Sequence, residues 1–291
     1  MASFEPVSLD QQERYLRLLR KSGTRASDYS FINLWGWAEE YGLQWSFEDD
    51  LVWIRQTLPE EVFWAPVGDL EGVSWGEAFG SLGVRDASFI RVPQPVVEVW
   101  EGRLAGRFQA VEDRGNWDYL YSVSELVKLS GNRFHKKKNL VNQFRKKYDY
   151  RYVDLDASLI GQTRDMQERW CAWRDCESSQ TLAAENRVIG RVLEAWERLA
   201  NILGGAIIVD GRVVAFSIAE AFSSDTLIIH FEKGFTDFSG SYQAINQMFL
   251  AAHEEFSLVN REQDLNEEGL RQAKLSYNPV DFVRKYLVSF S

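Results

Sequence analysis

The chain has 291 residues, of which 45% are hydrophobic and 14% aromatic, and its formal net charge is −10 at pH 7. This length and hydrophobic content allow one large domain or two ordinary ones with buried cores, and they exclude a mostly disordered chain. The apolar runs are too short to cross a bilayer, and the N-terminus lacks the basic and apolar regions of a secretory signal, so we expect a cytoplasmic protein without a transmembrane segment.

The first half of the chain alternates predicted helices and strands. Residues 9–22 and 28–42 have the apolar spacing of helices, and Asp10 and Asp28 stand where N-cap residues are expected. A hairpin is predicted over 43–56, because its sequence alternates around an acidic turn. The remaining elements are strand-like runs at 61–68, 88–93 and 106–122 and a helix-like segment at 74–83.

The second half begins at a basic helix and continues as a second α+β segment. Its predicted strands are 150–156, 204–210, 212–222, 225–234, 257–260 and 281–290, and its longer helices are 157–174, 183–200 and 239–256. Asp210 and Gly211 join two of the strands, and this dipeptide tolerates the positive φ of a tight turn. We therefore expect an α+β fold with mixed, mostly antiparallel sheets flanked by helices.

The cysteines and histidines give no sign of a metal site. Cys171 and Cys176 lie close together on a predicted helix, with no second pair of cysteines in the chain. Because disulfides are rare in the cytoplasm, we expect two reduced thiols. The three histidines are far apart in sequence and lack the spacing of metal ligands, so no metal is expected.

A basic segment lies between Glu125 and Asp149 in this otherwise acidic chain, and it contains eight Lys or Arg residues and no carboxylate. Its apolar residues share one arc of a helical wheel, which predicts an amphipathic helix. They are Phe134, Leu140, Val141, Phe144 and Tyr148. Lys137 also falls inside this arc, either as a lysine whose stem packs at the edge of the apolar stripe or as a cation directed into an interdomain cleft.

Two interpretations of the outward basic residues remain open. They form a solvated helix face, or they form a surface that contacts the phosphates of a nucleic acid, which would explain the lack of carboxylates. The candidate nucleic-acid-binding residues are Arg133, Lys136, Lys138, Arg145, Lys146 and Lys147.

The order of elements in the second half, a β-meander followed by a strand, a loop and a long helix, is that of the Gcn5-related N-acyltransferase fold. Acetyl-CoA enzymes of this fold carry Gln/Arg-x-x-Gly-x-Gly/Ala before the helix, where backbone N–H groups bind a pyrophosphate. The corresponding segment "EKGFTDFSGSYQAIN" keeps only Gly240 and, less directly, Gly234. This loss argues against acetyl-CoA, and Gly240 has the alternative role of starting a helix.

Four blocks of the second half carry a further resemblance: "LSGNRFHKKKNLVNQF", "IHFEKG", "GSYQAINQMF" and "VNREQDLNEEGLRQAKLSYNP". Together they resemble the phosphatidylglycerol lysyltransferase C-terminal-domain-like family, a tandem Gcn5-related acyltransferase-fold group related to the Fem peptidyltransferases. The resemblance implies two acyltransferase-like domains, which we place at residues 1–125 and 126–291.

The resemblance also implies an aminoacyl-tRNA-dependent aminoacyltransferase, with charged tRNA as donor, no other cofactor, and an unidentified acceptor such as a lipid or a peptide. Two alternatives stay open because one fold hosts many functions. One is an acyl-CoA-dependent N-acyltransferase that acts on a small amine. The other is a catalytically inert RNA- or protein-binding module.

An activated ester needs little from an enzyme beyond orientation, an oxyanion site and the movement of one proton. The candidate catalytic residues are chosen for these roles. Glu232 and Lys233 end the strand before the loop, and successive strand residues face opposite sides, so only one of them can face the cleft. The block after residue 259 interleaves carboxylates and cations that would shift each other's pKa values, unless it is a salt-bridged surface loop. The candidates are Lys274, Lys233, Tyr242, Glu232 and Asp264.

The candidate substrate-binding residues come from the basic helix, the loop and helix after the meander, and the C-terminal block. They are Lys137, Asn139, Ser239, Gly240, Gln243, Asn246, Asn260, Arg261, Glu262 and Tyr277. Lys274 and Tyr277 lie in the block that resembles the Lys-containing block of the Fem-like proteins. Tyr242 is the best neutral acid or hydrogen-bond donor near the helix start, with core packing as its alternative role.

Overall fold

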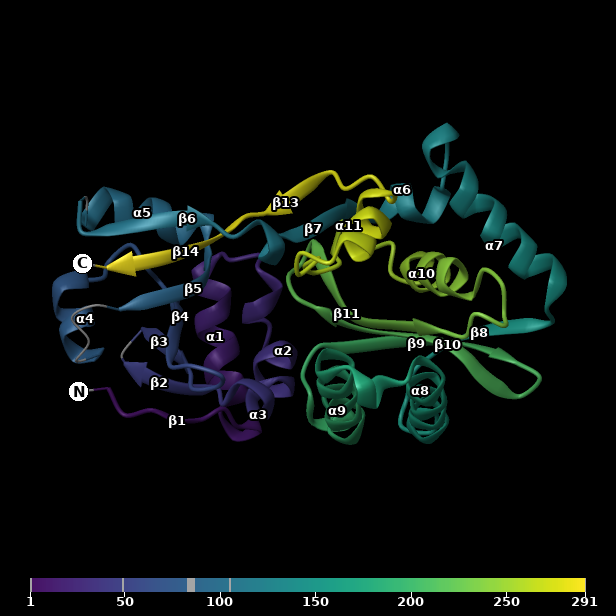
Figure 1. The fold of residues 1–291 in the computed structure, drawn as a ribbon, viewed down its shortest axis with the longest axis horizontal. Helices are drawn as coiled ribbons and strands as arrows, with labels where there is room; N and C mark the ends of the chain where they lie inside the picture. The colour runs from purple at the N-terminus through teal and green to yellow at the C-terminus, as the bar shows by residue number, and fades with distance from the viewer. Residues whose placement is uncertain (1, 49, 83–86, 105, 291) are drawn as a thin grey trace. The chain divides into compact units, whose positions relative to one another are not determined.

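The computed structural model describes residues 2–48, 50–82, 87–104 and 106–290 of the chain. In these residues it contains two mixed seven-stranded sheets, each flanked by helices (Figure 1). The predicted α+β class, with two mixed sheets flanked by helices, is therefore confirmed.

The two sheets belong to two compact units that are interleaved in sequence. Unit 1 contains Met1–Asp118, Gln263–Arg271 and Phe282–Ser291, and unit 2 contains Tyr119–Glu262 and Gln272–Asp281. The domain boundary between residues 125 and 126 stays a prediction. The compact units are divided differently, because Gln263–Arg271 and Phe282–Ser291 belong to unit 1 although they follow most of unit 2 in the sequence.

Unit 1 is built on the sheet with strand order β1-β2-β3-β4-β5-β14-β6. Its strands are β1 (Glu5–Pro6), β2 (Gln44–Glu48), β3 (Leu51–Gln56), β4 (Val62–Gly68), β5 (Ser88–Pro93), β6 (Phe108–Glu112) and β14 (Lys285–Phe290). Its helices are α1 (Gln12–Ser22), α2 (Phe31–Gly36), α3 (Ala38–Tyr41), α4 (Trp75–Leu82) and α5 (Gln94–Leu104). The predicted hairpin is formed by β2 and β3. Residue 49 of its turn, and residue 83 at the end of the helix predicted before β5, lie outside the described residues.

The last strand of the chain, β14, lies in the sheet of unit 1 between β5 and β6. Its Phe290 ring packs against Phe89 of β5 and Trp100 of α5, with ring centroids 5.7 and 5.4 Å apart. The local alternation of residues predicts this strand, but it cannot identify the neighbours, because the pairing joins residues that are far apart in sequence.

The two predicted N-cap residues of the first half have other roles, so these predictions are wrong. Helix α2 is capped by Ser30, whose Oγ accepts a hydrogen bond from the N–H of Asn33 at 3.1 Å. Helix α1 begins after Gln11 without a side-chain cap, and Asp10 lies inside a preceding 3₁₀ turn. Asp28 is buried and takes part in an ionic cluster instead.

This unit 1 ionic cluster consists of Asp28, Arg91, Asp118 and Lys285. The Nζ atom of Lys285 donates to a carboxylate oxygen of Asp28 and, at 2.6 Å, to Oδ1 of Asp118, and all three side chains are 0% exposed. Arg91 pairs with Asp28 at 2.5 Å. Burial acts to raise the pKa of Asp28, but the charges of Lys285 and Arg91 outweigh it and hold this pKa below its ordinary value. Two cations and two carboxylates thus balance one another away from water.

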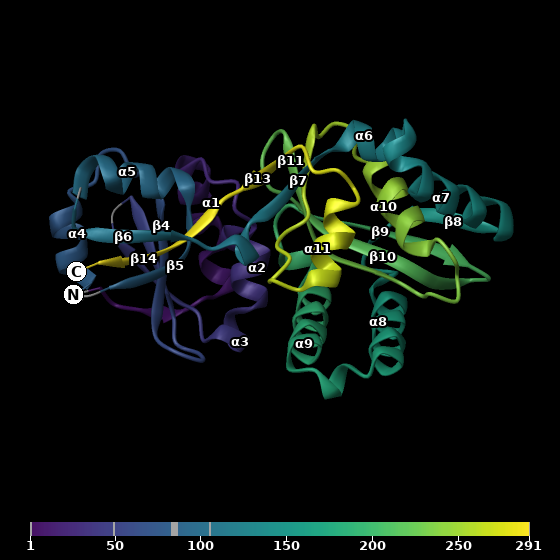
Figure 2. The same cartoon turned by 45° about the horizontal axis from the view of Figure 1, so that its top comes forward.

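Unit 2 is built on the sheet with strand order β13-β7-β12-β11-β10-β9-β8. Its strands are β7 (Asp118–Ser122), β8 (Tyr150–Asp154), β9 (Ile202–Val209), β10 (Arg212–Ala221), β11 (Thr226–Gly234), β12 (Leu258–Asn260) and β13 (Asp281–Val283). The helices are α6 (Val123–Lys128), α7 (His135–Lys147), α8 (Ile160–Arg174), α9 (Gln180–Glu194), α10 (Ser241–Ala251) and α11 (Glu268–Leu275). Helices α8 and α9 cover one face of this sheet, and α7 and α10 cover the other (Figures 1 and 2).

The predicted meander is formed by β9, β10 and β11. Asp210 and Gly211 have φ angles of 49° and 75°, as the tight turn between β9 and β10 requires. After α10 the chain returns as β12, which pairs in parallel with only the first three residues of β11, from Thr226 to Ile228. Within the described residues, the C-terminal half of β11 therefore has no strand partner on that side, and side chains from other elements approach it there.

Cys171 and Cys176 form a disulfide, so the prediction of reduced thiols is wrong. Helix α8 ends at Arg174, and Asp175 adopts a left-handed conformation with φ of 52°, which reverses the chain. The two Cα atoms are consequently 5.1 Å apart, within the range that a disulfide needs. The reversal could not be read from the spacing of the cysteines.

Candidate active site

The C-terminal end of β11 carries two charged residues with different surroundings. Glu232 accepts hydrogen bonds from Asn246 Nδ2 of α10 at 2.9 Å and from Arg261 Nη2 at 3.0 Å. Lys233 pairs instead with Glu185 of α9, at 2.6 Å between Nζ and Oε2. Because α9 and α10 cover opposite faces of the sheet, the two side chains point to opposite sides, as strand geometry predicts.

On the face of the sheet where Lys233 lies, an aromatic side chain packs against the lysine and buries it. The Nζ atom of Lys233 lies 4.2 Å from the ring centroid of Trp170, and the lysine side chain is 8% exposed. The Nε1–H of Trp170 donates to the hydroxyl oxygen of Tyr242 at 2.8 Å, and burial raises the pKa of Tyr242. Two predicted catalytic residues, Lys233 and Tyr242, therefore meet around a buried tryptophan.

On the Glu232 side, residues from three predicted segments meet around one tyrosine ring. The guanidinium carbon of Arg261 lies 4.8 Å from the ring centroid of Tyr277, and Nζ of Lys137 lies 4.2 Å from it. Burial raises the pKa of Tyr277, and the charge of Arg261 and a hydrogen bond with Gln243 act against that rise. The ring thus brings together α7, the chain after β12 and the chain after α11.

Lys137 differs from the other basic residues of α7. It is half-buried, whereas Lys136 and Lys138 are exposed. Burial, followed by the charges of Arg261 and Lys136, lowers the pKa of Lys137. The predicted inward position of Lys137 is confirmed, and this lysine releases its proton more readily than an exposed lysine does.

Arg261 is held in place from several sides. Burial acts to lower the pKa of Arg261, but the charge of Glu232 outweighs it, so the guanidinium stays charged. The ammonium of Lys274 donates to the backbone carbonyl of Arg261, and the Tyr121 hydroxyl donates to the carbonyl of Lys274 at 2.9 Å. Lys137, Glu232, Arg261, Lys274 and Tyr277 form what we term the unit 2 basic site, which contains three cations and one carboxylate.

Tyr121 also supports this site, although its position could not be predicted from the sequence. It lies on β7, which pairs with β12 so that Tyr121 stands opposite Val259. The only available signal was the pair of alternating tyrosines in "DYLYS", and that pattern does not reveal which strand lies beside it.

A buried histidine, also missed from sequence, stands beside the same loop. His230 of β11 lies between Glu262, at 2.9 Å from its Nδ1, and Glu220, at 3.4 Å from its Nε2. Burial acts to lower the pKa of His230, but the hydrogen bonds and charges of the two glutamates raise it to about 9. Asn260 Oδ1 accepts from the N–H of Glu262 at 2.8 Å. The predicted substrate-binding residues Asn260 and Glu262 thus order the chain around Arg261.

Asp264, a predicted catalytic residue, lies in unit 1, whereas Lys274 lies in unit 2. The carboxylate of Asp264 pairs with Arg114 at 3.2 Å and with Arg271 at 2.9 Å, and it is fully buried. The N–H of Asn266 donates to the same carboxylate at 2.9 Å. These contacts organise the loop that follows β12 within unit 1.

The loop before α10 is shaped by its contact with α7. Gly240 precedes α10 with φ of 88°, and a Cβ atom at this position would lie 2.4 Å from the backbone oxygen of Leu140. Close packing and helix initiation therefore account for this glycine. Ser239 is exposed in the same loop, and Asn139 is exposed on α7, with its amide 3.4 Å from the ring nitrogens of His135.

The outer side of α7 carries the predicted basic face. Val141 and Phe144 are buried, whereas Lys136, Lys138 and Lys146 are exposed, so the predicted amphipathic helix is confirmed. The other basic residues of this face are also exposed and have neighbours: Arg133 pairs with Glu125, Arg145 donates to Gln247 at 2.9 Å, and Lys147 lies 5.0 Å from the Tyr148 ring centroid.

Neither a metal site nor a membrane-spanning helix occurs in the described part of the chain. No group of three His, Cys, Asp or Glu residues is placed there to hold a metal ion. None of the described helices combines the length and apolarity that a bilayer crossing demands.

Comparison with known proteins adds a family match to this geometry. The family model described as phosphatidylglycerol lysyltransferase, C-terminal, matches residues 19–289. The chain is also 23% identical over 175 residues to an uncharacterized protein of Mycoplasmoides gallisepticum, a match that covers 59% of this chain and 55% of that protein. The chain therefore spans about half the length of this curated relative.

Two solved structures are similar over nearly the whole chain. A conserved protein of unknown function from Bacteroides thetaiotaomicron is 32% identical, with a TM-score of 0.91 and all of both chains covered. The C-terminal domain of a putative lysylphosphatidylglycerol synthetase from Agrobacterium fabrum is 13% identical, with a TM-score of 0.67, 97% of this chain and 92% of that chain covered. At this low identity the second similarity concerns the fold alone.

Proposed function

Because the chain belongs to the phosphatidylglycerol lysyltransferase C-terminal family, we propose that it is an aminoacyltransferase that uses charged tRNA as its donor. One observation carries the proposal: a single helix, α7, supplies both an exposed basic face and the half-buried Lys137 of the basic site. The basic face, Lys137, Arg261 and Tyr277 all belong to unit 2.

The proposed reaction begins with an activated ester. The acceptor's nitrogen or oxygen attacks the ester carbonyl carbon, and the bond from this carbon to the ribose oxygen of the tRNA then breaks. The proton of the acceptor must reach the departing ribose oxygen. Lys137 in its neutral form accepts this proton and returns it, which its lowered pKa favours. No further cofactor is needed, because the ester already supplies the driving force.

Arg261 is the proposed oxyanion-stabilising group. Its pairing with Glu232 fixes the guanidinium, and fixed charges stabilise a developing oxyanion without reorganisation at the moment of reaction. Lys274 acts through Arg261, because its ammonium holds the carbonyl of that residue. In this proposal Lys274 is a positioning residue, and Tyr277 forms the wall between the two cations.

The experiment that tests the proposal compares donors. The purified protein would be incubated with tRNA charged with radiolabelled amino acids, with hydroxylamine as a small surrogate acceptor, and in parallel with radiolabelled acetyl-CoA. We expect the protein to accelerate transfer from charged tRNA and not from acetyl-CoA. Transfer from acetyl-CoA alone would establish the acyl-CoA alternative, and tRNA binding without turnover of either donor would indicate an inert binding module.

The acceptor would be sought separately. Mass spectrometry of lipids and peptides that copurify with the protein would nominate candidates, and each would replace hydroxylamine in the charged-tRNA assay. The true acceptor should support transfer at a far lower concentration than hydroxylamine. Binding to the protein would offset most of the entropy that is lost when the acceptor and the ester are brought together.

A further inference from the structure

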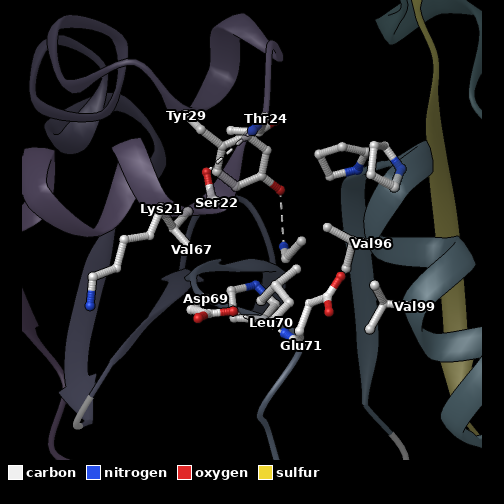
Figure 3. Close-up of a pocket in the computed structure, with 14 residues that line it drawn as sticks. Lys21, Ser22, Thr24, Tyr29, Val67, Asp69, Leu70, Glu71, Val96 and Val99 are labelled. Atoms are coloured by element: carbon white, nitrogen blue, oxygen red, sulfur yellow. Dashed lines mark hydrogen bonds between the residues drawn. The ribbon is translucent and has the colours of Figure 1, made fainter.

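Unit 1 contains a pocket of about 230 Å³ that plays no part in the proposed reaction (Figure 3). It lies where two parallel strands separate, because β4 and β5 pair only at Phe63–Phe89 and Trp64–Ile90. Beyond these pairs, the last residues of β4 face the start of α5. A pocket of this volume has room for a small organic molecule.

Most of the surface that lines this pocket is apolar, and Ser22 and Thr24 add hydroxyl groups. Val67 and Leu70 line one side and Val96 and Val99 of α5 line the other. The hydroxyl of Tyr29 already accepts from the N–H of Ala65 at 3.0 Å and donates to a backbone carbonyl of β5 at 3.1 Å, so its ring is the part available to a ligand. Prolines at three lining positions further reduce the number of backbone donors.

The charged groups around the pocket leave an excess of negative charge. Asp69 and Glu71 both line it, and within the described residues neither carboxylate pairs with Lys, Arg or His; Arg103 reaches only the backbone carbonyl of Glu71, at 3.4 Å. Lys21 also lines the pocket, but its ammonium pairs with Asp50 at 2.7 Å. In Figure 3 the Glu71 carboxylate points toward Val96, whereas Lys21 extends away from it.

We propose that this pocket binds a small organic cation, namely an amine carried on an apolar body. The apolar walls would bury the body, and the carboxylates of Asp69 and Glu71 would pair with the ammonium at the rim. A neutral ligand of the same shape would bury the same apolar surface but would lack the charge interaction. The proposal is independent of the aminoacyl transfer proposed for unit 2.

The test uses the full chain and a matched pair of probes, phenethylamine and phenethyl alcohol, which have the same shape and differ in charge. Methyl NMR spectra would be recorded during each titration. We expect phenethylamine to shift the methyl signals of Leu70, Val96 and Val99, and to bind about five- to tenfold more tightly than the alcohol at low salt. An absence of shifts at these methyls, or equal affinity for both probes, would overturn the proposal.

Variants test the pocket itself and its negative charge separately. Asp69→Asn combined with Glu71→Gln should reduce the preference for the amine to less than about twofold while leaving alcohol binding unchanged. Glu98→Gln, on α5 but outside the pocket lining, is the matched control and should change neither affinity. Val99→Phe, at a half-buried position in the pocket wall, should fill the pocket and abolish binding of both probes, with circular dichroism confirming that the variant folds. If binding of either probe survives this variant, the ligand sits elsewhere.

Discussion

The unit 1 ionic cluster and the unit 2 basic site both combine lysine and arginine with carboxylates, but in different surroundings. In unit 1, Lys285 and Arg91 are balanced by Asp28 and Asp118, and the lysine and both carboxylates are 0% exposed. In unit 2, Arg261 pairs with Glu232, Lys274 donates to the backbone carbonyl of Arg261, and Lys137 lies against the Tyr277 ring. In the first arrangement each cation pairs with a buried carboxylate, whereas in the second Lys137 is half-buried beside an aromatic ring.

This difference indicates where chemistry can occur. A closed and balanced cluster has no group left to interact with a substrate, and its removal would affect folding alone. In the proposed ester transfer, the charged Arg261 beside the half-buried Lys137 would stabilise the developing negative charge. The difference between the two regions can be tested by substituting one residue in each and measuring both the free energy of unfolding and the rate of aminoacyl transfer.

The largest effect is expected from Lys285→Met. This change leaves Asp28 and Asp118 buried with only Arg91 to compensate, so the free energy of unfolding should fall by about 3–5 kcal/mol. Chemical denaturation measures this loss. The matched control is Lys21→Met, which removes a lysine from an exposed pair with Asp50 and should cost less than about 1 kcal/mol. If Lys285→Met were no more destabilising than this control, the structural role of the unit 1 ionic cluster would be wrong.

Arg261→Gln should instead act on turnover. Without the guanidinium the oxyanion loses a fixed cation, so transfer from charged tRNA should slow by about 10²–10³-fold, while Asn246 still hydrogen-bonds to Glu232. Steady-state transfer rates check this expectation. Arg164→Gln, on the opposite face of the sheet, carries the same charge change and should transfer at the wild-type rate; equal rates for Arg261→Gln and Arg164→Gln would show that the basic site is misassigned.

A change of pH sharpens the contrast between the units. The pKa of His230 is raised to about 9, so its ion pairs stabilise the fold fully below the unfolded pKa of about 6.5 and are lost as pH rises through about 9. We expect the free energy of unfolding to decrease by on the order of 2–3 kcal/mol over this range. In the unit 1 ionic cluster, the pKa of Asp28 lies below its ordinary value, so this carboxylate stays charged over the same pH range.

The variant His230→Gln tests the origin of that slope. Its unfolding free energy should be lower at about pH 6 and should vary little between about pH 6.5 and 9, as followed by denaturation at each pH. If wild type and variant show the same pH dependence, another group is responsible and the buried histidine is neutral throughout.

The smallest effect is expected on the outer face of α7. Replacing Lys136 and Lys138 by Gln should weaken binding of all tRNAs about equally and reduce the log–log salt slope by roughly 0.7–0.9 for each phosphate that is no longer neutralised. Fluorescence titration at several salt concentrations measures the slope. The same double change at Arg20 and Lys21 of unit 1 should leave it unaltered. If the salt slope does not change when Lys136 and Lys138 are replaced, this face is a solvated helix surface that does not contact phosphates.

Local sequence patterns predict some parts of this molecule well. The helical wheel of residues 134–148 identifies the buried side of α7 and the inward position of Lys137, because both depend only on helix period. Strand alternation separates Glu232 from Lys233 for the same reason. Asp210 and Gly211 mark their turn through the backbone conformations that these residues tolerate.

Other features depend on tertiary packing that no local pattern reveals. Tyr121 supports Lys274 only because β7 pairs with β12, and Asp28 meets Lys285 across most of the length of the chain. The position of Asp28 before a helix is its only signal in the sequence, and that signal suggests a helix cap. The disulfide of Cys171 and Cys176 depends likewise on the reversal at Asp175.

The most direct test of the central claim is a single-turnover measurement with charged tRNA bound to excess protein, comparing wild type, Arg261→Gln and Lys285→Met under conditions where all three are folded. Rapid-quench sampling would follow the loss of labelled amino acid from the tRNA to hydroxylamine. We expect Lys285→Met to transfer at the wild-type rate and Arg261→Gln to be slower by about 10²–10³-fold. Equal rates for all three proteins, or no acceleration by wild type, would contradict the assignment of aminoacyl transfer to the unit 2 basic site.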